Sequence, residues 1–391
     1  MPDRETRHMQ LAEKYLPESL LTRFRERAGV YDRENRFFDE DLTELIAQGY
    51  LTLFVPEEFG GAGLSLNQVC RLQQRLATAA PATALAVNMH LMCTGVVRAM
   101  FARGDRSLDY VFDEAMAGEI FAFGVSEPGN DWVLQDSTTV AEPLDDGGYL
   151  LTGVKIFTSL SPVWTRLIVH GLDKTDASNP TLVYGFVDRS TDGISVSDRW
   201  DVLGMRASQS RATTLTAVRM RPERVARSFP AGRHPDLLTF AITSHFQLMI
   251  GSVYAGVARR ALELAAQGLK SRTSAKSGTT YADVPEFRAR LADTYMEYMA
   301  VPAQLDTYSR DVDELVDHGA GWPLRLVSAR INASTLARHA VETALMCAGG
   351  AGFDNTSELS RLHRDAAASL FHPPSADAAR PMYAAALLDD H

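Results

Sequence analysis

The stretch GEIFAFGVSEPGNDWVLQDSTTVAEPLDDGGYLLTGVKIFTSLSPVWTRLIVHG, residues 118–171, holds the densest cluster of strand and turn signals in an otherwise helical sequence. Its apolar runs IFAFGV, YLLTGVKIF and RLIVHGL are separated by clusters of Pro, Gly, Asn and Asp, a pattern typical of short antiparallel strands. Ser126, Asn130 and Ser159 stand where these runs end. Small polar side chains at strand ends suit a flat, heteroatom-rich ligand, so we expect a ligand platform in this stretch.

The sequence on either side of this stretch predicts a chain of three parts. Residues 1–118 and 231–391 carry apolar residues at helical spacing, whereas residues 119–230 carry β-branched runs with frequent turn signals. We therefore predict an α+β multidomain fold with an N-terminal α-helical domain, a middle β-barrel or sandwich domain and a C-terminal helical bundle. Ser65, followed three residues later by Gln68, predicts a capping box at a helix start.

Composition argues against several classes of function. The 391 residues carry a formal net charge of −10, which argues against nucleic acid as a partner. The cysteines Cys70, Cys93 and Cys347 lie far apart without a metal-ligand spacing, so we expect neither a metal site nor disulfides, and a cytoplasmic location. We also find no apolar run long enough to span a bilayer and expect no membrane partner.

Short motifs recur in a characteristic order along the whole chain. They are SEPGND at 126–131, KIFTS at 155–159, LGMRAS at 203–208, GGAGF at 349–353 and RDA at 364–366. Each alone is a common turn, strand or helix end. Together they resemble the acyl-CoA dehydrogenase superfamily of flavoproteins. The resemblance implies a C-terminal four-helix bundle, assembly as a homotetramer or homodimer, and FAD between the β domain and the bundle.

The resemblance also implies which residues bind the flavin. Phe157 matches the aromatic residue that packs on the flavin ring, and Ser159 matches a hydroxyl group near flavin N5. Arg272 matches a bundle arginine that meets the FAD phosphates of a partner subunit. The full set of implied cofactor-binding residues is Phe123, Val125, Ser126, Asn130, Phe157, Ser159, Arg272, Gly349, Gly350 and Gly352.

Two departures from the family pattern bear on the reaction. The SEPGND turn is two residues shorter than the family's T-E-P-x-x-G-S-D, and Asn130 can replace the missing serine as a donor. The catalytic Glu of the family is absent, because Pro373 stands at its usual position and residues 245–247, at the alternative position, read His-Phe-Gln. The remaining candidates for a catalytic base are His372, Asp377 and His245.

Three functions remain open on these residues. The predicted function is an FAD-dependent dehydrogenase that oxidises the α,β bond of an acyl thioester, on coenzyme A or an acyl carrier protein, passes hydride to flavin N5 and delivers electrons to a transfer partner. The alternative is a two-component monooxygenase of the same fold. Such enzymes lack the Glu, use reduced flavin (FMN or FAD) from a separate reductase together with O2, and rely on a His near the C-terminus, which fits His372. A second alternative is a non-catalytic flavin-binding protein. In each case we expect pocket walls from residues 247–251 and from the loop around Trp132.

Overall fold

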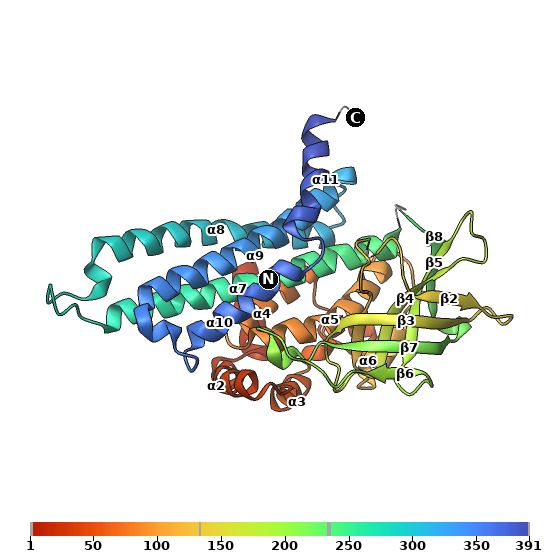
Figure 1. Cartoon of the computed structure of the whole chain (residues 1–391), viewed down its shortest axis with the longest axis horizontal. Coiled ribbons are helices and arrows are strands. Elements are labelled where there is room, and N and C mark those ends of the chain that lie inside the picture. The colour runs from red at the N-terminus through yellow and green to blue at the C-terminus, as the bar shows by residue number, and fades with distance from the viewer. Residues whose placement is uncertain (1–2, 133, 233–235, 390–391) are drawn as a thin grey trace.

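Helices form both ends of the chain and strands form its middle (Figure 1). The computed structural model describes residues 3–132, 134–232 and 236–389. The N-terminal part consists of the helices α1 (Arg4–Tyr15), α2 (Glu18–Glu34), α3 (Asp39–Ala47), α4 (Leu66–Ala77), α5 (Pro81–Phe101) and α6 (Tyr110–Met116). The predicted capping box begins α4: Ser65 Oγ accepts a hydrogen bond from Gln68 N, and Gln68 Oε1 accepts one from Ser65 N.

The strands of the middle part pair into one connected eight-stranded sheet, in the order β6-β7-β3-β2-β4-β5-β8 with β1 beside β4. β4 pairs with β1, β2 and β5, and six consecutive residues of this strand are buried, which agrees with its unbroken apolar run. The strands are β1 (Phe121–Gly124), β2 (Val140–Pro143), β3 (Tyr149–Thr158), β4 (Arg166–Asp173), β5 (Thr181–Asp188), β6 (Ile194–Val196), β7 (Arg211–Met220) and β8 (Val225–Pro230).

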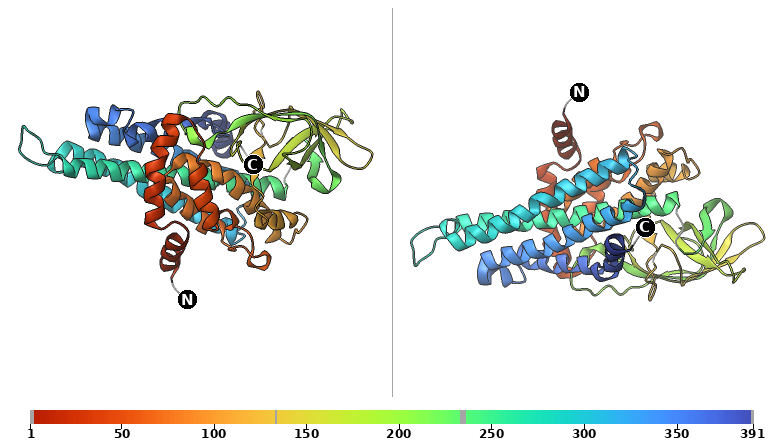
Figure 2. Two further views of the ribbon diagram at one scale, coloured as in Figure 1. Left: turned by 90° about the horizontal axis from the view of Figure 1, so that it is seen from below. Right: turned by 90° about the horizontal axis from the view of Figure 1, so that it is seen from above.

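Long helices follow the sheet. They are α7 (Leu237–Ser271), α8 (Pro285–Asp313), α9 (Trp322–Ala348), α10 (Glu358–Ala367) and α11 (Ala376–Leu388). Figures 1 and 2 show the sheet at one end of α7, α8 and α9, and the loop between α7 and α8 at the opposite end. In Figure 1 the last helix, α11, rises away from the bundle. The C-terminal part is thus a helical bundle with one projecting helix.

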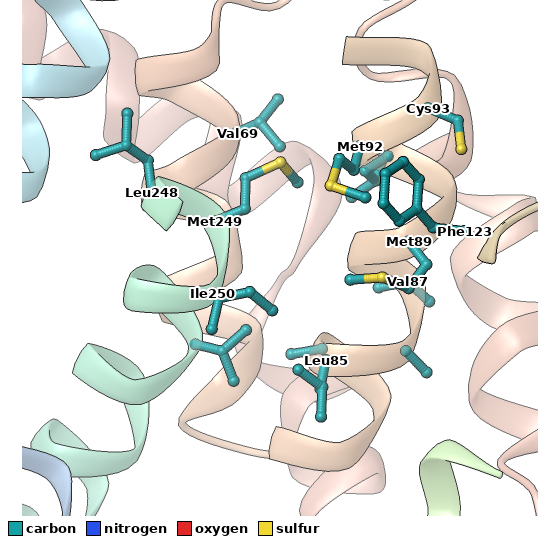
Figure 3. Packing of buried hydrophobic residues seen from close by; sticks show 14 of the residues in the cluster. Val69, Leu85, Val87, Met89, Met92, Cys93, Phe123, Leu248, Met249 and Ile250 are labelled. Carbon is teal, nitrogen blue, oxygen red and sulfur yellow. The ribbon is translucent and has the colours of Figure 1, made fainter. Parts of the chain in front are cut away.

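The core continues from the N-terminal helices into the bundle because α5 packs against α7. Figure 3 shows Leu85 and Met92 of α5 and Met249 and Ile250 of α7 in the space between these helices. The expectation that no run could span a bilayer was wrong by length and composition, since α5 and α7 both pass that test. Most of the apolar window of each helix is buried inside the fold, 89% in α5 and 72% in α7, as in the core helices of globular proteins.

A buried ion pair fixes the SEPGND turn to the sheet. Lys155 of β3 and Glu127 of the turn are both fully buried, and Lys155 Nζ lies 2.5 Å from Glu127 Oε1. The same carboxylate accepts hydrogen bonds from Thr139 Oγ1 at 2.6 Å and from the backbone N–H of Thr138 at 2.7 Å. Lys155 Nζ also donates to the carbonyl oxygen of His170 on β4 at 2.7 Å. The charges are therefore well solvated by protein groups, as a buried pair requires.

Replacing one member of this pair should destabilise the protein strongly. The Lys155→Met variant keeps the aliphatic stem but leaves the Glu127 carboxylate buried without its cation. We expect the free energy of unfolding to fall by about 3–5 kcal/mol, measured by urea denaturation. As a control, Arg219→Ala breaks an exposed pair with Asp146 and should cost less than about 1 kcal/mol. Equal losses in the two variants would contradict a structural role for the buried pair.

Candidate flavin and substrate cavity

A large cavity of about 1630 Å³ lies between the sheet and the bundle. Of the sequence-predicted residues, the cavity lining contains Phe123, Val125, Ser126, Phe157, Ser159 and His372. The predicted wall positions are also confirmed in part, because Gln247, Ile250 and Trp132 line the same cavity. The sequence therefore identified residues from the strand ends and from the bundle that the fold brings together.

Phe157 occupies an unusual backbone position at the cavity wall. Its φ of 57° lies in the left-handed region, where a non-glycine residue is rare, and the β3–β7 register shifts between Lys155 and Thr158. This bulge leaves 53% of Phe157 exposed, with its ring edge-to-face with Trp200 at a centroid distance of 6.4 Å. Backbone strain that presents an aromatic ring to an open cavity is typical of a functional site. The position suits the ring-packing role that the resemblance implies.

Three serine hydroxyls form a continuous hydrogen-bonded chain along the same wall. Ser159 Oγ lies 2.7 Å from Ser210 Oγ, which in turn lies 2.8 Å from Ser208 Oγ. All three residues line the cavity. Because a hydroxyl group can donate or accept, the chain can reverse its direction to match a ligand atom that gains or loses a proton. Ser159 is therefore able to serve a flavin nitrogen in more than one redox state.

The LGMRAS and RDA motifs contact each other at the rim of this wall. A side chain at Gly204 would have its Cβ 2.0 Å from the carbonyl oxygen of Arg364, so the loop and α10 approach backbone to backbone. The Met205 N–H donates to Asp365 Oδ1 at 2.6 Å. Burial raises the pKa of Asp365 to about 6. The two motifs, about 160 residues apart in sequence, thus pack against each other and fix the loop to α10.

His372 is held against the cavity by a partly buried polar network. Its Nε2 atom lies 2.7 Å from the hydroxyl oxygen of Tyr254 on α7. Gln247 Nε2 donates to the carbonyl oxygen of Pro373 at 3.0 Å, and Arg330 donates to Gln247 Oε1 at 2.6 Å and to the carbonyl oxygen of Pro374. These contacts clamp both residues that follow His372, so the imidazole has a defined position.

The same network keeps the imidazole uncharged. Burial and the positive charge of Arg330 lower the pKa of His372 to about 3. Arg330 is only 1% exposed and bonds to amide and carbonyl oxygens rather than to a carboxylate. A buried guanidinium without a carboxylate is costly, and these amide and carbonyl oxygens supply its hydrogen bonds. Tyr254, Gln247 and Arg330 lie far from His372 in sequence, and no spacing rule could have joined them to it.

Two of the three candidate bases lie outside this network. His245 is packed in the core: its Nδ1 lies 2.8 Å from the Ala241 carbonyl oxygen, it contacts Gly95, and burial lowers its pKa to about 4. Asp377 is largely exposed and paired with Arg380. Neither lines the cavity. Sequence proximity to the missing Glu misled in both cases, because His245 turns inward on α7 and Asp377 turns to solvent on α11.

The remaining predicted cofactor residues also lie away from the cavity lining. Asn130 closes its own turn, donating to Glu127 Oε2 and to the Asp136 carbonyl oxygen, both at 2.9 Å. Arg272 donates to the carbonyl oxygens of Gly268 at 3.1 Å and Ala348 at 2.8 Å, at the ends of α7 and α9. The glycines at 349–352 form a short helical turn beside it. A contact of Arg272 and these glycines with the flavin of a partner subunit stays a prediction.

Comparison with known proteins agrees with this geometry. Residues 10–103 match the family description "Acyl-CoA dehydrogenase, N-terminal domain", and residues 248–373 match "Acyl-CoA dehydrogenase, C-terminal domain". The chain belongs to the acyl-CoA dehydrogenase superfamily.

Relatives within this superfamily differ in activity. The chain is 29% identical over 377 residues to the amino sugar nitrososynthase DnmZ of Streptomyces peucetius, covering 94% of this chain and 89% of the relative. It is 25% identical over 270 residues to a dibenzothiophene monooxygenase of Rhodococcus qingshengii, covering 66% and 62%. The solved structure of KijD3 in complex with FMN and dTDP-3-amino-2,3,6-trideoxy-4-keto-3-methyl-D-glucose superposes with a TM-score of 0.83 at 25% identity, covering 95% and 91%. These superfamily members support a flavin site, whereas acyl-thioester dehydrogenation finds no specific support among them.

The uncharged state of His372 predicts a loss of stability in acid. An unfolded histidine takes up a proton near pH 6.5, whereas folded His372 does so only near pH 3. As the pH falls below about 6.5, the unfolded state alone gains this proton, so the free energy of unfolding decreases. The His372→Gln variant should lack this contribution, which amounts to at most about 1.4 kcal/mol per pH unit. The free energy of unfolding of both proteins is measured by urea denaturation at several pH values from about 7 to about 5. Identical pH dependences would show that folded His372 takes up its proton at the same pH as an unfolded histidine, which would contradict the lowered pKa.

Proposed function

We propose that the protein is a flavin-dependent monooxygenase that receives reduced flavin, as FMN, from a separate reductase. One oxygen atom of O2 enters the substrate and the other leaves as water, with the two electrons supplied by the reduced flavin when it is bound. The FMN complex of KijD3 and the names of the monooxygenase and nitrososynthase relatives support this choice. The reductase, a cytoplasmic location and assembly into a homotetramer or homodimer are parts of the same proposal.

One observation carries the proposal: an uncharged histidine, and not a carboxylate, faces the cavity where a dehydrogenase of this superfamily would hold its base. His372 lines the cavity and Pro373 follows it. Among the described lining residues the carboxylate is Asp131, which stands on the SEPGND turn and not on the bundle side. Removal of an α-proton needs a base within hydrogen-bond reach, and a carboxylate in this position is what the dehydrogenase reaction uses.

The residues of the chain suit the proposed reaction in three ways. Phe157 and the serine chain that begins at Ser159 offer a platform and hydroxyl donors to the flavin ring. As an uncharged imidazole, His372 can accept a hydrogen bond at one ring nitrogen and donate one from the other, and Tyr254 occupies Nε2. Arg330 adds a fixed positive charge behind His372, which favours negative charge that develops in the cavity.

Flavin binding and reaction with oxygen test the proposal directly. We expect the purified protein to bind reduced FMN at least about tenfold more tightly than oxidised FMN, measured by anaerobic fluorescence titration. On mixing with oxygenated buffer, bound reduced FMN should reoxidise more slowly than free reduced FMN, measured by stopped-flow absorbance. Tight binding of oxidised FAD, with anaerobic bleaching of its colour by an acyl-CoA, would instead establish the dehydrogenase alternative. Flavin binding without either reaction would favour the non-catalytic alternative.

His372 should slow the unproductive release of hydrogen peroxide from the enzyme. We expect His372→Gln to release hydrogen peroxide about tenfold faster than the wild type, because one hydrogen bond to a reactive group is worth about 1.4 kcal/mol. Peroxide is measured with a coupled peroxidase assay at constant reduced FMN. The control His339→Gln changes a histidine on α9 that lies half exposed beside Glu297, and it should behave as the wild type. An unchanged rate in His372→Gln would remove His372 from the mechanism.

A further inference from the structure

One face of α11 forms an apolar wall of the cavity. Cavity-lining residues recur along this helix at spacings of three and four, so they lie on a single face. They are Ala378, Pro381, Met382, Ala385 and Ala386. The helix is joined to the start of α9 by a hydrogen bond of 2.7 Å from the Tyr383 hydroxyl to the Leu324 carbonyl oxygen. The apolar face is thereby held toward the cavity while α11 projects from the bundle (Figure 1).

Apolar side chains from two other helices face the same space. They are Ile242, Phe246 and Ile250 of α7 and Pro323, Leu324 and Val327 of α9. We call the part of the cavity between these residues and the α11 face the apolar compartment. The serine chain belongs to the sheet side, and the uncharged polar side chains on the bundle side of the lining are Thr243, Gln247 and His372. A flavin on the sheet side would leave the apolar compartment open, because the cavity exceeds the roughly 300–1,000 Å³ that one drug-sized ligand needs.

The arginines near the cavity, Arg364 and Arg330, already have protein partners. Among the described lining residues the cation is Arg364, which is paired with Asp32 and bonded to Ser360 Oγ at 3.0 Å. Arg330 lies behind the wall, with its donors directed at Gln247 and at the Pro374 carbonyl oxygen. A ligand diphosphate inside the apolar compartment would therefore lose its hydration without a hydrogen bond or direct ion pair from these two arginines, which is strongly unfavourable.

We infer that the apolar compartment binds the substrate and selects an uncharged, largely apolar molecule, such as a fused aromatic ring system, over a nucleotide-linked sugar. This inference rests on the proposed function for the position of the flavin. It separates the chain from KijD3, whose structure holds a dTDP-linked amino sugar. Burial of apolar ligand surface against α7, α9 and α11 supplies the binding energy, at about 25 cal/mol per Å².

Binding measurements on the full chain saturated with FMN test this inference. The probes are indole, an uncharged bicyclic ring, and dTDP, each titrated by calorimetry. We expect indole to bind at least about tenfold more tightly than dTDP. Ala385→Asp places a charge on the apolar face of α11 and should weaken indole binding by about tenfold or more. Ala384→Asp is the matched control, because it adds the same residue to the exposed face of the same helix and should bind indole as the wild type does.

The outcomes distinguish this inference from the proposed function. Tighter binding of dTDP than of indole, or equal indole affinities of the Ala384→Asp and Ala385→Asp variants, would overturn it. If FMN does not bind, the proposed function fails, while indole titration of the flavin-free chain still decides whether the compartment selects apolar ligands. Ala386→Asp serves as a second variant on the same face if Ala385→Asp fails to fold by circular dichroism. Loss of indole binding in that variant with FMN binding retained would support the assignment.

Discussion

The buried pair between Glu127 and Lys155 is the interaction on which the cavity depends. Two opposite charges without access to solvent are stable only when nearly all their hydrogen bonds are made inside the protein, and here backbone and hydroxyl donors from the turn after Asp136 complete the shell around the carboxylate. This shell draws together β3, β4 and the turn that carries Ser126. These segments are held rigidly, because moving any of them would leave Glu127 or Lys155 buried without its partner.

A second buried charge organises the opposite wall. Arg330 has no carboxylate partner among its described contacts. Hydrogen bonds to amide and carbonyl oxygens therefore have to offset the free-energy cost of burying its charge. Those same oxygens belong to Gln247 and to the segment after His372. The cation therefore does two things through one set of contacts: it fixes the histidine in place, and it disfavours its protonation. Position 373, where the family's acidic residue is expected, is a proline in this chain.

Residues of the cavity wall could be predicted where a local motif determines their position, but not where the fold brings together residues that are distant in sequence. Phe157 and Ser159 could be placed because a strand, a turn and a short motif fix their neighbours within a few residues. The partnership of His372 with Tyr254 could not, since the two residues are 118 positions apart and Tyr254 resembles any other buried residue of a long helix. Apolar length likewise predicts burial or membrane insertion equally well, so only the packing of α5 and α7 showed which applies. The position of α11 at the cavity wall could not be predicted either, because a run of alanines gives no sign of what its face will contact.

Gly204 has a consequence for the size of the cavity. At this position the loop between β6 and β7 touches the backbone of α10 at Arg364, with no room for even one methyl group. The close approach of the sheet side and the bundle side therefore depends on the absence of a side chain at Gly204. Any larger residue at this position would force the loop away from α10, which would widen the cavity and weaken its contacts with a bound ligand.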